Sequence, residues 1–288
     1  MATLTYKVKL ATILGTFQSA LTNFRYLSKT WKQNCEEERL LGVSMTGIMD
    51  NSLINNPDDT SLPEKLRYLR GVAVEMNKEY AEKLGINRST AISCVKPSGT
   101  VSQLVDAASG IHPRYAQYYI RTVRGDAKDP LTNFMKDQGI PWEPCVMKPN
   151  DTVVFSFPIA APEGSVLRDD LPALKHLALW KIYADHWCEH KPSITVEYKP
   201  EEFPAIQAWL WDNIDGCSGV SFLPRSEHTY QQAPYQPCDR LTYESVLAKM
   251  PVQINWSGLS RYETEDTTEG VSTMACSAGA CEIVDVKR

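Results

Sequence analysis

The sequence predicts an α/β protein in which helices alternate with short strands. The main observation is a strand–helix–strand series, with strands expected at 193–198 and 220–223 and a helix at 200–213 between them. A helical crossover of this kind joins parallel neighbours, so we expect the two strands to pair in parallel. Composition agrees, because 43% hydrophobic and 23% charged residues are ordinary for a globular chain. It excludes a disordered, collagen-like or coiled-coil protein.

The first third of the chain is expected to be helical. Apolar residues recur at helical spacing from residue 7 to residue 27, and further helices are expected over 31–49 and 63–84. Gly85 follows the third of these and is a typical helix stop. The segment 50–63 is rich in Asn, Asp, Ser and Pro and is predicted to be a loop.

From residue 91 the pattern changes to short strands and helices. The expected elements, in chain order, are a strand at 91–95, a helix beginning at Val101, strand and loop at 112–124, a short helix at 129–138, a strand at 152–157 and a long helix at 171–190. The chain contains no internal repeat. Residues 260–281 hold few large apolar groups, so they bury little surface. We therefore expect one folded part over 1–250 and a flexible tail over 251–288.

Charge and cysteine content limit the classes of partner. Thirty basic and 35 acidic residues give a net charge of −5, without the basic footprint of a duplex-binding protein. No run approaches 18 apolar residues, and the first residues lack the layout of a signal peptide. Eight cysteines among 288 residues are too sparse for a small disulfide scaffold. We expect a cytoplasmic protein that binds neither nucleic acid nor membrane.

The segment Val95-Lys-Pro-Ser-Gly-Thr-Val-Ser102 lies between an expected strand and an expected helix. Free N–H groups at a helix start bind anions, and Gly99 lets a phosphate approach the backbone. The hydroxyls of Ser98, Thr100 and Ser102 add donors. The segment is not a Walker A loop. The alternative is an ordinary helix start capped by a serine.

Two cysteines near the C-terminus, Cys276 and Cys281, are separated by four small residues. A loop of this length allows disulfide geometry, and the pair lies in a polar segment rather than in a core. A dithiol in such a place is typical of redox exchange. The alternatives are half of a metal site or two inert thiols.

A third pattern is His186-Trp-Cys-Glu189-His190, which fits the H-x-x-E-H sequence of inverted zinc peptidases. On a helix the two histidines share a face. A catalytic zinc needs a third protein ligand, and none is evident downstream. The alternative is a helix end with two hydrogen-bonded histidines, and we expect no metal. Cys35, beside Glu36 and Glu37, is interpreted as part of a charged helix start.

Several segments together resemble the class II, adenosylcobalamin-dependent ribonucleotide reductases, especially the monomeric triphosphate reductases. The segments are Glu37–Gly47, Val95–Ser102, Ser109–Arg114, Asp185–Pro192, Gly219–Pro224, His228–Tyr235 and Ala275–Ile283. Their order runs through nearly the whole chain, which resembles the C-terminal part of such a reductase. The resemblance implies part of a ten-stranded α/β barrel of the reductase and glycyl-radical type, followed by the flexible tail.

The resemblance also implies roles for residues. The phosphate of a ribonucleotide is held by the loop residues Pro97, Ser98, Gly99, Thr100, Val101 and Ser102. Cys276 and Cys281 resemble the shuttle pair that reduces the active-site disulfide after each turnover and is itself reduced by thioredoxin or glutaredoxin. The substrate implied is a ribonucleoside triphosphate, although a diphosphate remains open.

One departure from the family concerns the radical cysteine. The family carries it in an Asn-x-Cys-x-Glu motif, which this chain lacks; Asn34-Cys35-Glu36 has no spacer. We therefore expect a split or shortened reductase whose thiyl cysteine and bound adenosylcobalamin belong to a partner, the N-terminal half. This chain is then inactive alone. A reductase fragment that binds a nucleotide or partner without turnover is the alternative.

Class I is the alternative within the family, and it needs tandem tyrosines near the strand at Val220. Phe222 and Leu223 stand there instead, whereas the one tandem pair, Tyr118 and Tyr119, lies far earlier. Neither phenylalanine nor leucine has a phenol to oxidise, which favours class II.

Overall fold

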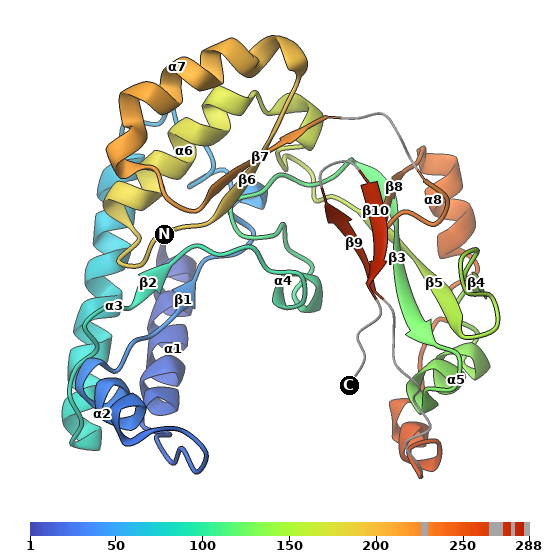
Figure 1. Ribbon diagram of the computed structural model, residues 1–288, viewed down its shortest axis with the longest axis horizontal. Helices are drawn as coiled ribbons and strands as arrows, with labels where there is room; N and C mark the ends of the chain where they lie inside the picture. Colours follow the sequence, from blue (N-terminus) through green and yellow to red (C-terminus); the bar gives the residue numbers. More distant parts are fainter. Residues whose placement is uncertain (226–229, 265–272, 278–279, 285–288) are drawn as a thin grey trace. The chain divides into compact units, whose positions relative to one another are not determined.

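The computed structural model describes residues 1–225, 230–264, 273–277 and 280–284, and side chains up to residue 264. The chain forms two compact units, Met1–Arg114 with Pro162–Ser226 and Tyr115–Ala161 with Glu227–Arg288. Both mix helices and strands, as Figure 1 shows, so the expected α/β class is confirmed. The ten-stranded barrel and the boundary at residue 250 stay predictions.

The first unit begins with three helices, α1 (Ala2–Ser19), α2 (Lys29–Glu38) and α3 (Leu62–Leu84). α3 matches its prediction closely. A proline lies in its first turn, and Gly85 ends it with a left-handed φ of 65°. Its buried residues follow helical spacing: Leu62, Leu66, Leu69, Ala73, Asn77 and Ala81. α1 packs against α3.

The apolar side of α1 does not face the core as the sequence pattern suggests. Leu14 is 70% exposed and Phe17 is 48% exposed, whereas Val8, Thr12 and Thr16 are buried. The threonine hydroxyls donate to the carbonyls of Val8 and Thr12, both at 2.8 Å, so their burial leaves no hydroxyl unsatisfied. Polar side chains satisfied within their own helix thus occupy the core-facing side.

The helix predicted over 31–49 is wrong beyond residue 38. Arg39 ends α2 in a left-handed conformation with a φ of 46°. The following residues alternate between buried and exposed, a strand period. β1 (Val43–Ser44) pairs in parallel with β2 (Ser93–Cys94), and the short helix η1 (Ile48–Asp50) follows β1.

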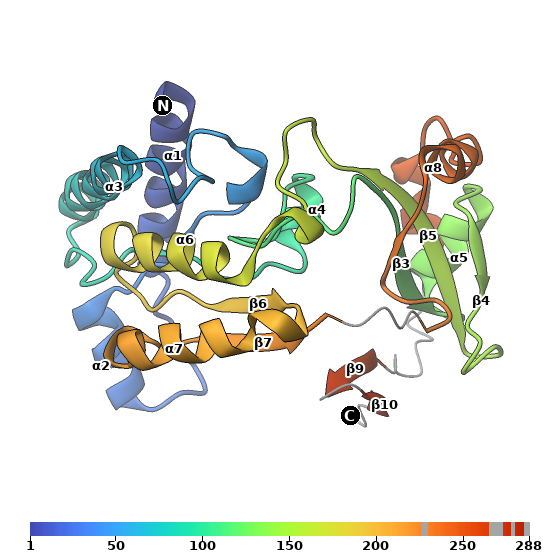
Figure 2. The same ribbon diagram turned by 90° about the horizontal axis from the view of Figure 1, so that it is seen from above.

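The predicted strand–helix–strand series is confirmed. β6 (Ile194–Tyr198) pairs in parallel with β7 (Val220–Pro224), with Ile194 opposite Val220. Between them lie η3 (Pro200–Glu202), α7 (Phe203–Asn213) and η4 (Ile214–Gly216). In Figure 2, α7 runs beside this strand pair, and α6 (Ala173–His186) lies near β6. η2 (Arg168–Asp170) precedes α6.

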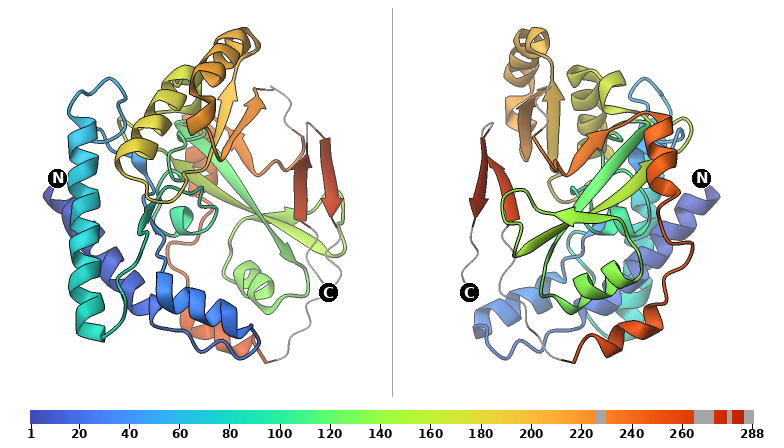
Figure 3. Two further views of the ribbon diagram at one scale, coloured as in Figure 1. Left: turned by 60° about the vertical axis from the view of Figure 1, so that its left-hand side comes forward. Right: turned by 90° about the vertical axis from the view of Figure 1, so that its right-hand side faces the viewer.

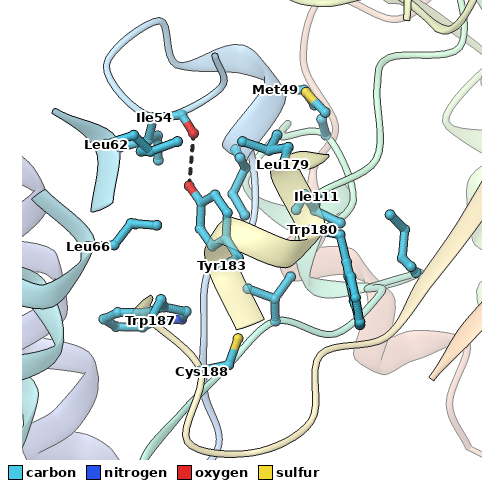
Figure 4. Packing of buried hydrophobic residues seen from close by; sticks show 14 of the residues in the cluster. Met49, Ile54, Leu62, Leu66, Ile111, Leu179, Trp180, Tyr183, Trp187 and Cys188 are labelled. Carbon is cyan, nitrogen blue, oxygen red and sulfur yellow. Dashed lines mark hydrogen bonds between the residues drawn. The ribbon is translucent and has the colours of Figure 1, made fainter. Parts of the chain in front are cut away.

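The core of the first unit joins α3, α6 and the strands. Figure 4 shows Leu62 and Leu66 of α3 close to Tyr183, whose hydroxyl donates to the carbonyl of Ile54 at 3.0 Å. Trp187 is fully buried and donates through Nε1 to the carbonyl of Cys94 at 2.8 Å. The end of β2, where the segment Val95–Ser102 begins, is thus anchored in this core.

The second unit is built on a four-stranded antiparallel sheet in the order β4-β5-β3-β8. Its strands are β3 (Tyr118–Asp126), β4 (Trp142–Pro144), β5 (Thr152–Ala160) and β8 (Tyr235–Pro237). α8 (Arg240–Leu247) packs on β5 and β3, as Figure 3 also shows, and α5 (Pro130–Asp137) is the predicted short helix. A small apolar core contains Ile140, Val153 and Phe155.

The expected tail contains more regular structure than the sequence suggests. η5 (Trp256–Arg261) is followed by the antiparallel strands β9 (Thr273–Ser277) and β10 (Ala280–Val284). The parts of the tail at 265–272, 278–279 and 285–288 lie outside the described residues, so its flexibility stays a prediction. Within the described chain, no helix has both the length and the apolar character needed to cross a membrane.

Candidate functional site: a loop with free backbone amides

The candidate phosphate loop leaves the core directly after β2. Val95 is fully buried, whereas Lys96 is exposed. The N–H of Lys96 donates to Ser44 Oγ at 3.1 Å, which ties the start of the loop to β1. The loop then enters α4 (Val101–Leu104), a single turn of helix. It therefore connects a strand to a helix, as the sequence predicts.

The serines of the loop bind its own backbone. Ser98 Oγ accepts the N–H of Ser102 at 3.0 Å, and the Ser102 hydroxyl donates to the carbonyl of Ser98. Ser102 is fully buried, so its hydroxyl shapes the turn and does not face solvent. The N-cap residue of α4 is Thr100, which makes no side-chain cap hydrogen bond, so the serine cap that the sequence allowed as an alternative is absent and Ser98 instead satisfies one N–H of the turn. This hydrogen bond does not exclude an anion, because other donors of the loop are left over.

Three consecutive backbone amides remain without a partner. Among the described residues, none accepts a hydrogen bond from the N–H of Gly99, Thr100 or Val101. All three residues are exposed. A Cβ added to Gly99 would meet nothing within 4 Å, and its φ lies outside the left-handed region. Nothing in the fold itself requires a glycine here, which fits a position that must admit an external group.

Lys96 places a positively charged side chain at the start of the loop. Lys96 Nζ donates to the carbonyl of Lys191 at 2.7 Å and to Ser193 Oγ at 2.8 Å. His112, on the chain after the loop, accepts the N–H of Thr195 on Nε2 at 3.0 Å. Its Nδ1 lies 2.9 Å from the carbonyl of Ser109, so the ring is neutral with its proton on Nδ1. Burial lowers the pKa of His112, in agreement with a neutral ring.

Known proteins share this arrangement of elements. No protein-family model matches the chain. The adenosylcobalamin-dependent ribonucleoside-triphosphate reductase of Lactobacillus acidophilus is 26% identical to it over 94% of this chain and 40% of that protein. The probable enzyme of the same description from Dictyostelium discoideum is 29% identical, over 73% of this chain and 27% of its own length.

A crystal structure of a B12-dependent, class II ribonucleotide reductase superposes on the chain with a TM-score of 0.75. The superposition covers 90% of this chain and 40% of the reductase chain, and the two sequences are 23% identical. This chain is a relative of the adenosylcobalamin-dependent ribonucleoside-triphosphate reductases. The resemblance predicted from the sequence is thereby confirmed. The chain spans about two fifths of the length of the curated reductases it matches first.

The tandem tyrosines Tyr118 and Tyr119 lie in β3 and have structural roles in the second unit. Tyr119 is 3% exposed and packs on Tyr235 with ring centroids 5.9 Å apart. Tyr118 packs on Tyr243 at 5.0 Å. Since the matched reductases depend on cobalamin, class I is not favoured.

The candidate shuttle cysteines lie opposite each other in the backbone register. Cys276 of β9 is the partner of Cys281 of β10 in the antiparallel pair. Directly opposed residues in such a pair have Cα atoms about 4.5–5.5 Å apart, within the range that a disulfide allows. Their side chains lie outside the described part of the chain, so the role of these cysteines stays a prediction.

The H-x-x-E-H pattern does not form a zinc site in the described residues. α6 ends at His186, so the expected shared helix face does not exist. Glu189 Oε2 accepts the N–H of Ile92 at 2.8 Å, and His190 Nε2 donates to the carbonyl of Leu41 at 2.7 Å. The described chain holds no group of three side chains placed to bind a metal. The pattern instead ties the end of α6 to neighbouring backbone.

The Asn34-Cys35-Glu36 segment lies within α2 and is not a catalytic loop. Glu36 accepts a hydrogen bond from Thr22 Oγ1 at 2.8 Å and lies 3.8 Å from Lys32 Nζ. Cys35 is half-buried. The segment is helical and charged as expected, but it lies at the C-terminal end of α2 and not at a helix start.

Proposed function

We propose that this chain forms the phosphate-holding part of a class II ribonucleotide reductase, which converts ribonucleoside triphosphates to 2′-deoxyribonucleotides. The observation that carries the proposal is the row of three free amides at Gly99, Thr100 and Val101. It occurs in a chain whose curated relatives are ribonucleoside-triphosphate reductases. The triphosphate is the substrate named for those relatives.

The loop holds the phosphate through backbone donors. Each free N–H donates to one phosphate oxygen, and hydrogen bonds to an ionised acceptor are about twice as strong as neutral ones. Gly99 presents no side chain, so a phosphate oxygen approaches the backbone closely. Because α4 is a single turn, the helix dipole adds little and the amides themselves provide most of the binding.

The relatives are named as dependent on adenosylcobalamin. Each described histidine already has a ring nitrogen in a hydrogen bond, as His112, His176, His186 and His190 show, so none of them is assigned to the cobalt. We propose that the cofactor binds with the N-terminal half of the enzyme. None of the steps proposed for this chain passes through it.

The second role proposed for this chain is a thiol relay. Each reduction of a ribonucleotide consumes two electrons and oxidises two active-site thiols to a disulfide. A Cys276 or Cys281 thiolate attacks that disulfide, and the other cysteine of the pair resolves the mixed disulfide. The active-site thiols are restored, and the pair is left oxidised. Thioredoxin or glutaredoxin then supplies two electrons and two protons to reset it.

The radical cysteine is proposed to lie on a partner polypeptide, the N-terminal half. This chain has no Asn-x-Cys-x-Glu motif, so we expect no turnover by the chain alone. Mixing it with the missing half should give deoxyribonucleotide formation that depends on adenosylcobalamin. Turnover by this chain alone would contradict the split. Nucleotide binding without turnover in the mixture would instead support a non-catalytic binding module.

The phosphate loop is tested separately with Gly99→Val. The structure leaves room for this side chain, so stability should hold while the affinity for a ribonucleoside triphosphate falls at least tenfold. Gly71→Val is the matched control, because Gly71 also has nothing within 4 Å of an added Cβ and also lies outside the left-handed region. The affinity of the wild type and of each of the two variants for a ribonucleoside triphosphate should be measured by calorimetry. Equal affinity for Gly99→Val and the wild type would refute the loop assignment.

A further inference from the structure

A buried ion pair lies behind the phosphate loop and does not touch its free amides. Arg114 is 3% exposed, and its Nη2 and Nε lie 2.9 and 3.0 Å from the two carboxylate oxygens of Asp50. Ser165 Oγ also donates to Asp50, at 2.9 Å. A pair held in this bidentate way and supported by further hydrogen bonds is rigid.

This ion pair holds the chain segment Asp106–Gly110. Asp50 Oδ2 accepts the N–H of Ala108 at 2.7 Å. Arg114 donates to the carbonyl of Asp106 at 2.6 Å and to its carboxylate at 3.1 Å. Both members of the ion pair therefore bind the backbone of this segment. Asp50 accepts the N–H of Ala108, and Arg114 donates to the carbonyl of Asp106.

The same segment holds the phosphate loop from the other side. Ser109 Oγ accepts the N–H of Ser98 at 2.8 Å. Gly110 has a φ of 55°, and a Cβ there would lie 2.7 Å from the carbonyl oxygen of Lys96. Thr46 Oγ1 accepts the N–H of Gly110 at 3.0 Å and donates to the carbonyl of Ala108 at 2.9 Å. The segment thus lies between the ion pair and the start of the loop.

We propose that Asp50 and Arg114 are positioning residues for nucleotide phosphate, acting through Asp106–Gly110 on the loop. They supply no donor to the phosphate. They set where the backbone at Ser98 lies, and hence where the next three amides point. This inference rests on the proposed function of the loop, and it assigns a role to Arg114 of the Ser109–Arg114 segment, which the sequence left without one.

The test is Asp50→Asn in the full chain, with binding of ATP, CTP, GTP and UTP measured by calorimetry well below the unfolding temperature. An amide removes the charge and can place an N–H against the N–H of Ala108. We expect triphosphate affinity to fall at least tenfold. Asp59→Asn is the matched control, since Asp59 forms an ion pair with Lys65 at 2.7 Å in the same unit. It should change affinity by less than threefold.

Two further variants separate positioning from general loss of stability. Leu69→Ala destabilises the buried face of α3 away from the loop and should leave triphosphate affinity unchanged. Ser109→Ala removes only the acceptor of the Ser98 N–H and should weaken binding even if Asp50→Asn does not fold. The proposal is overturned if Asp50→Asn folds and binds triphosphate with normal affinity while Gly99→Val loses binding. If Asp50→Asn does not fold, normal affinity in Ser109→Ala has the same consequence. If Gly99→Val also binds normally, the loop assignment itself is at fault.

Discussion

Gly110→Ala is the sharpest test of how the loop is supported. Gly110 adopts a left-handed φ of 55°, and an added Cβ would lie 2.7 Å from the carbonyl oxygen of Lys96 and 3.3 Å from its carbonyl carbon. These are backbone atoms, so no flexible side chain can move aside. The substitution therefore combines backbone strain with a forced displacement of the residue that precedes the loop.

Two other glycines separate these effects. Gly85 has a φ of 65° with nothing near its Cβ position, so Gly85→Ala measures the strain alone. Gly219 has a φ of 71° and would place a Cβ 2.7 Å from the carbonyl oxygen of Pro192, between Lys191 and Ser193, which bind the side chain of Lys96. Left-handed backbone costs a residue with a Cβ about 1–2 kcal/mol. Crowding against fixed atoms adds about 1–3 kcal/mol.

The expected losses in the free energy of unfolding follow from these terms. Gly85→Ala should lose about 1–2 kcal/mol, and both Gly110→Ala and Gly219→Ala about 2–5 kcal/mol. Urea unfolding measures these values, and calorimetry measures triphosphate binding by the same proteins. Gly110→Ala should also weaken binding, and by more than Gly219→Ala, because its added Cβ displaces the backbone of Lys96 rather than the groups that bind its side chain. The close contact between Gly110 and Lys96 does not position the loop if Gly110→Ala is as stable as Gly85→Ala. The same holds if Gly110→Ala binds triphosphate as tightly as Gly219→Ala.

Three further outcomes are expected. In the reconstituted enzyme, replacing Cys276 and Cys281 with serine should spare the first turnover and stop later ones when thioredoxin is the reductant. A small dithiol should restore the rate of the double variant. Full multiple turnover with thioredoxin would exclude the relay. Burial lowers the pKa of His176 from 6.5 to about 3, so the folded state stays unprotonated while the unfolded state gains a proton. The free energy of unfolding should therefore be highest above pH 6.5 and fall by about 1.4 kcal/mol per pH unit below it. Urea unfolding between pH 5 and 7.5 should show a shallower fall for His176→Gln than for the wild type. Glu189→Ala should lower the free energy of unfolding by about 1–3 kcal/mol, because the N–H of Ile92 loses its acceptor, with no change in the metal content of the purified protein.

The sequence predicts those elements whose local signals and tertiary packing agree. α3 has a proline in its first turn, a regular buried stripe and a left-handed Gly85, so its bounds follow from the pattern alone. The parallel pairing of β6 with β7 also follows, because the connection between them is long enough for a helix. In both cases the local and the long-range requirements select the same structure.

Elsewhere a tertiary contact overrides the local pattern. Residues after Arg39 carry apolar side chains that suit a helix, yet β1 forms because β2 offers it a parallel partner about 50 residues away. The buried side of α1 contains Thr12 and Thr16, whose hydroxyls donate to carbonyls of their own helix. Thr16 also accepts a hydrogen bond from Asn77 of α3 at 3.0 Å. Hydropathy alone does not reveal this contact, which forms only after the two helices meet.

The candidate site shows the same limit. The motif predicts where a phosphate could bind, but the structure decides which of its donors are available. The N–H of Ser98 donates to Ser109, and the N–H and hydroxyl of Ser102 donate to Ser98. Among the described residues, the three amides of residues 99–101 are left without an acceptor. That selection depends on Thr46 and Asp50, which lie about 50 residues before the loop and hold it through Asp106–Gly110. A chain with the same eight loop residues but without this support would present its amides differently, so the proposed phosphate site depends on the loop and on the residues that support it.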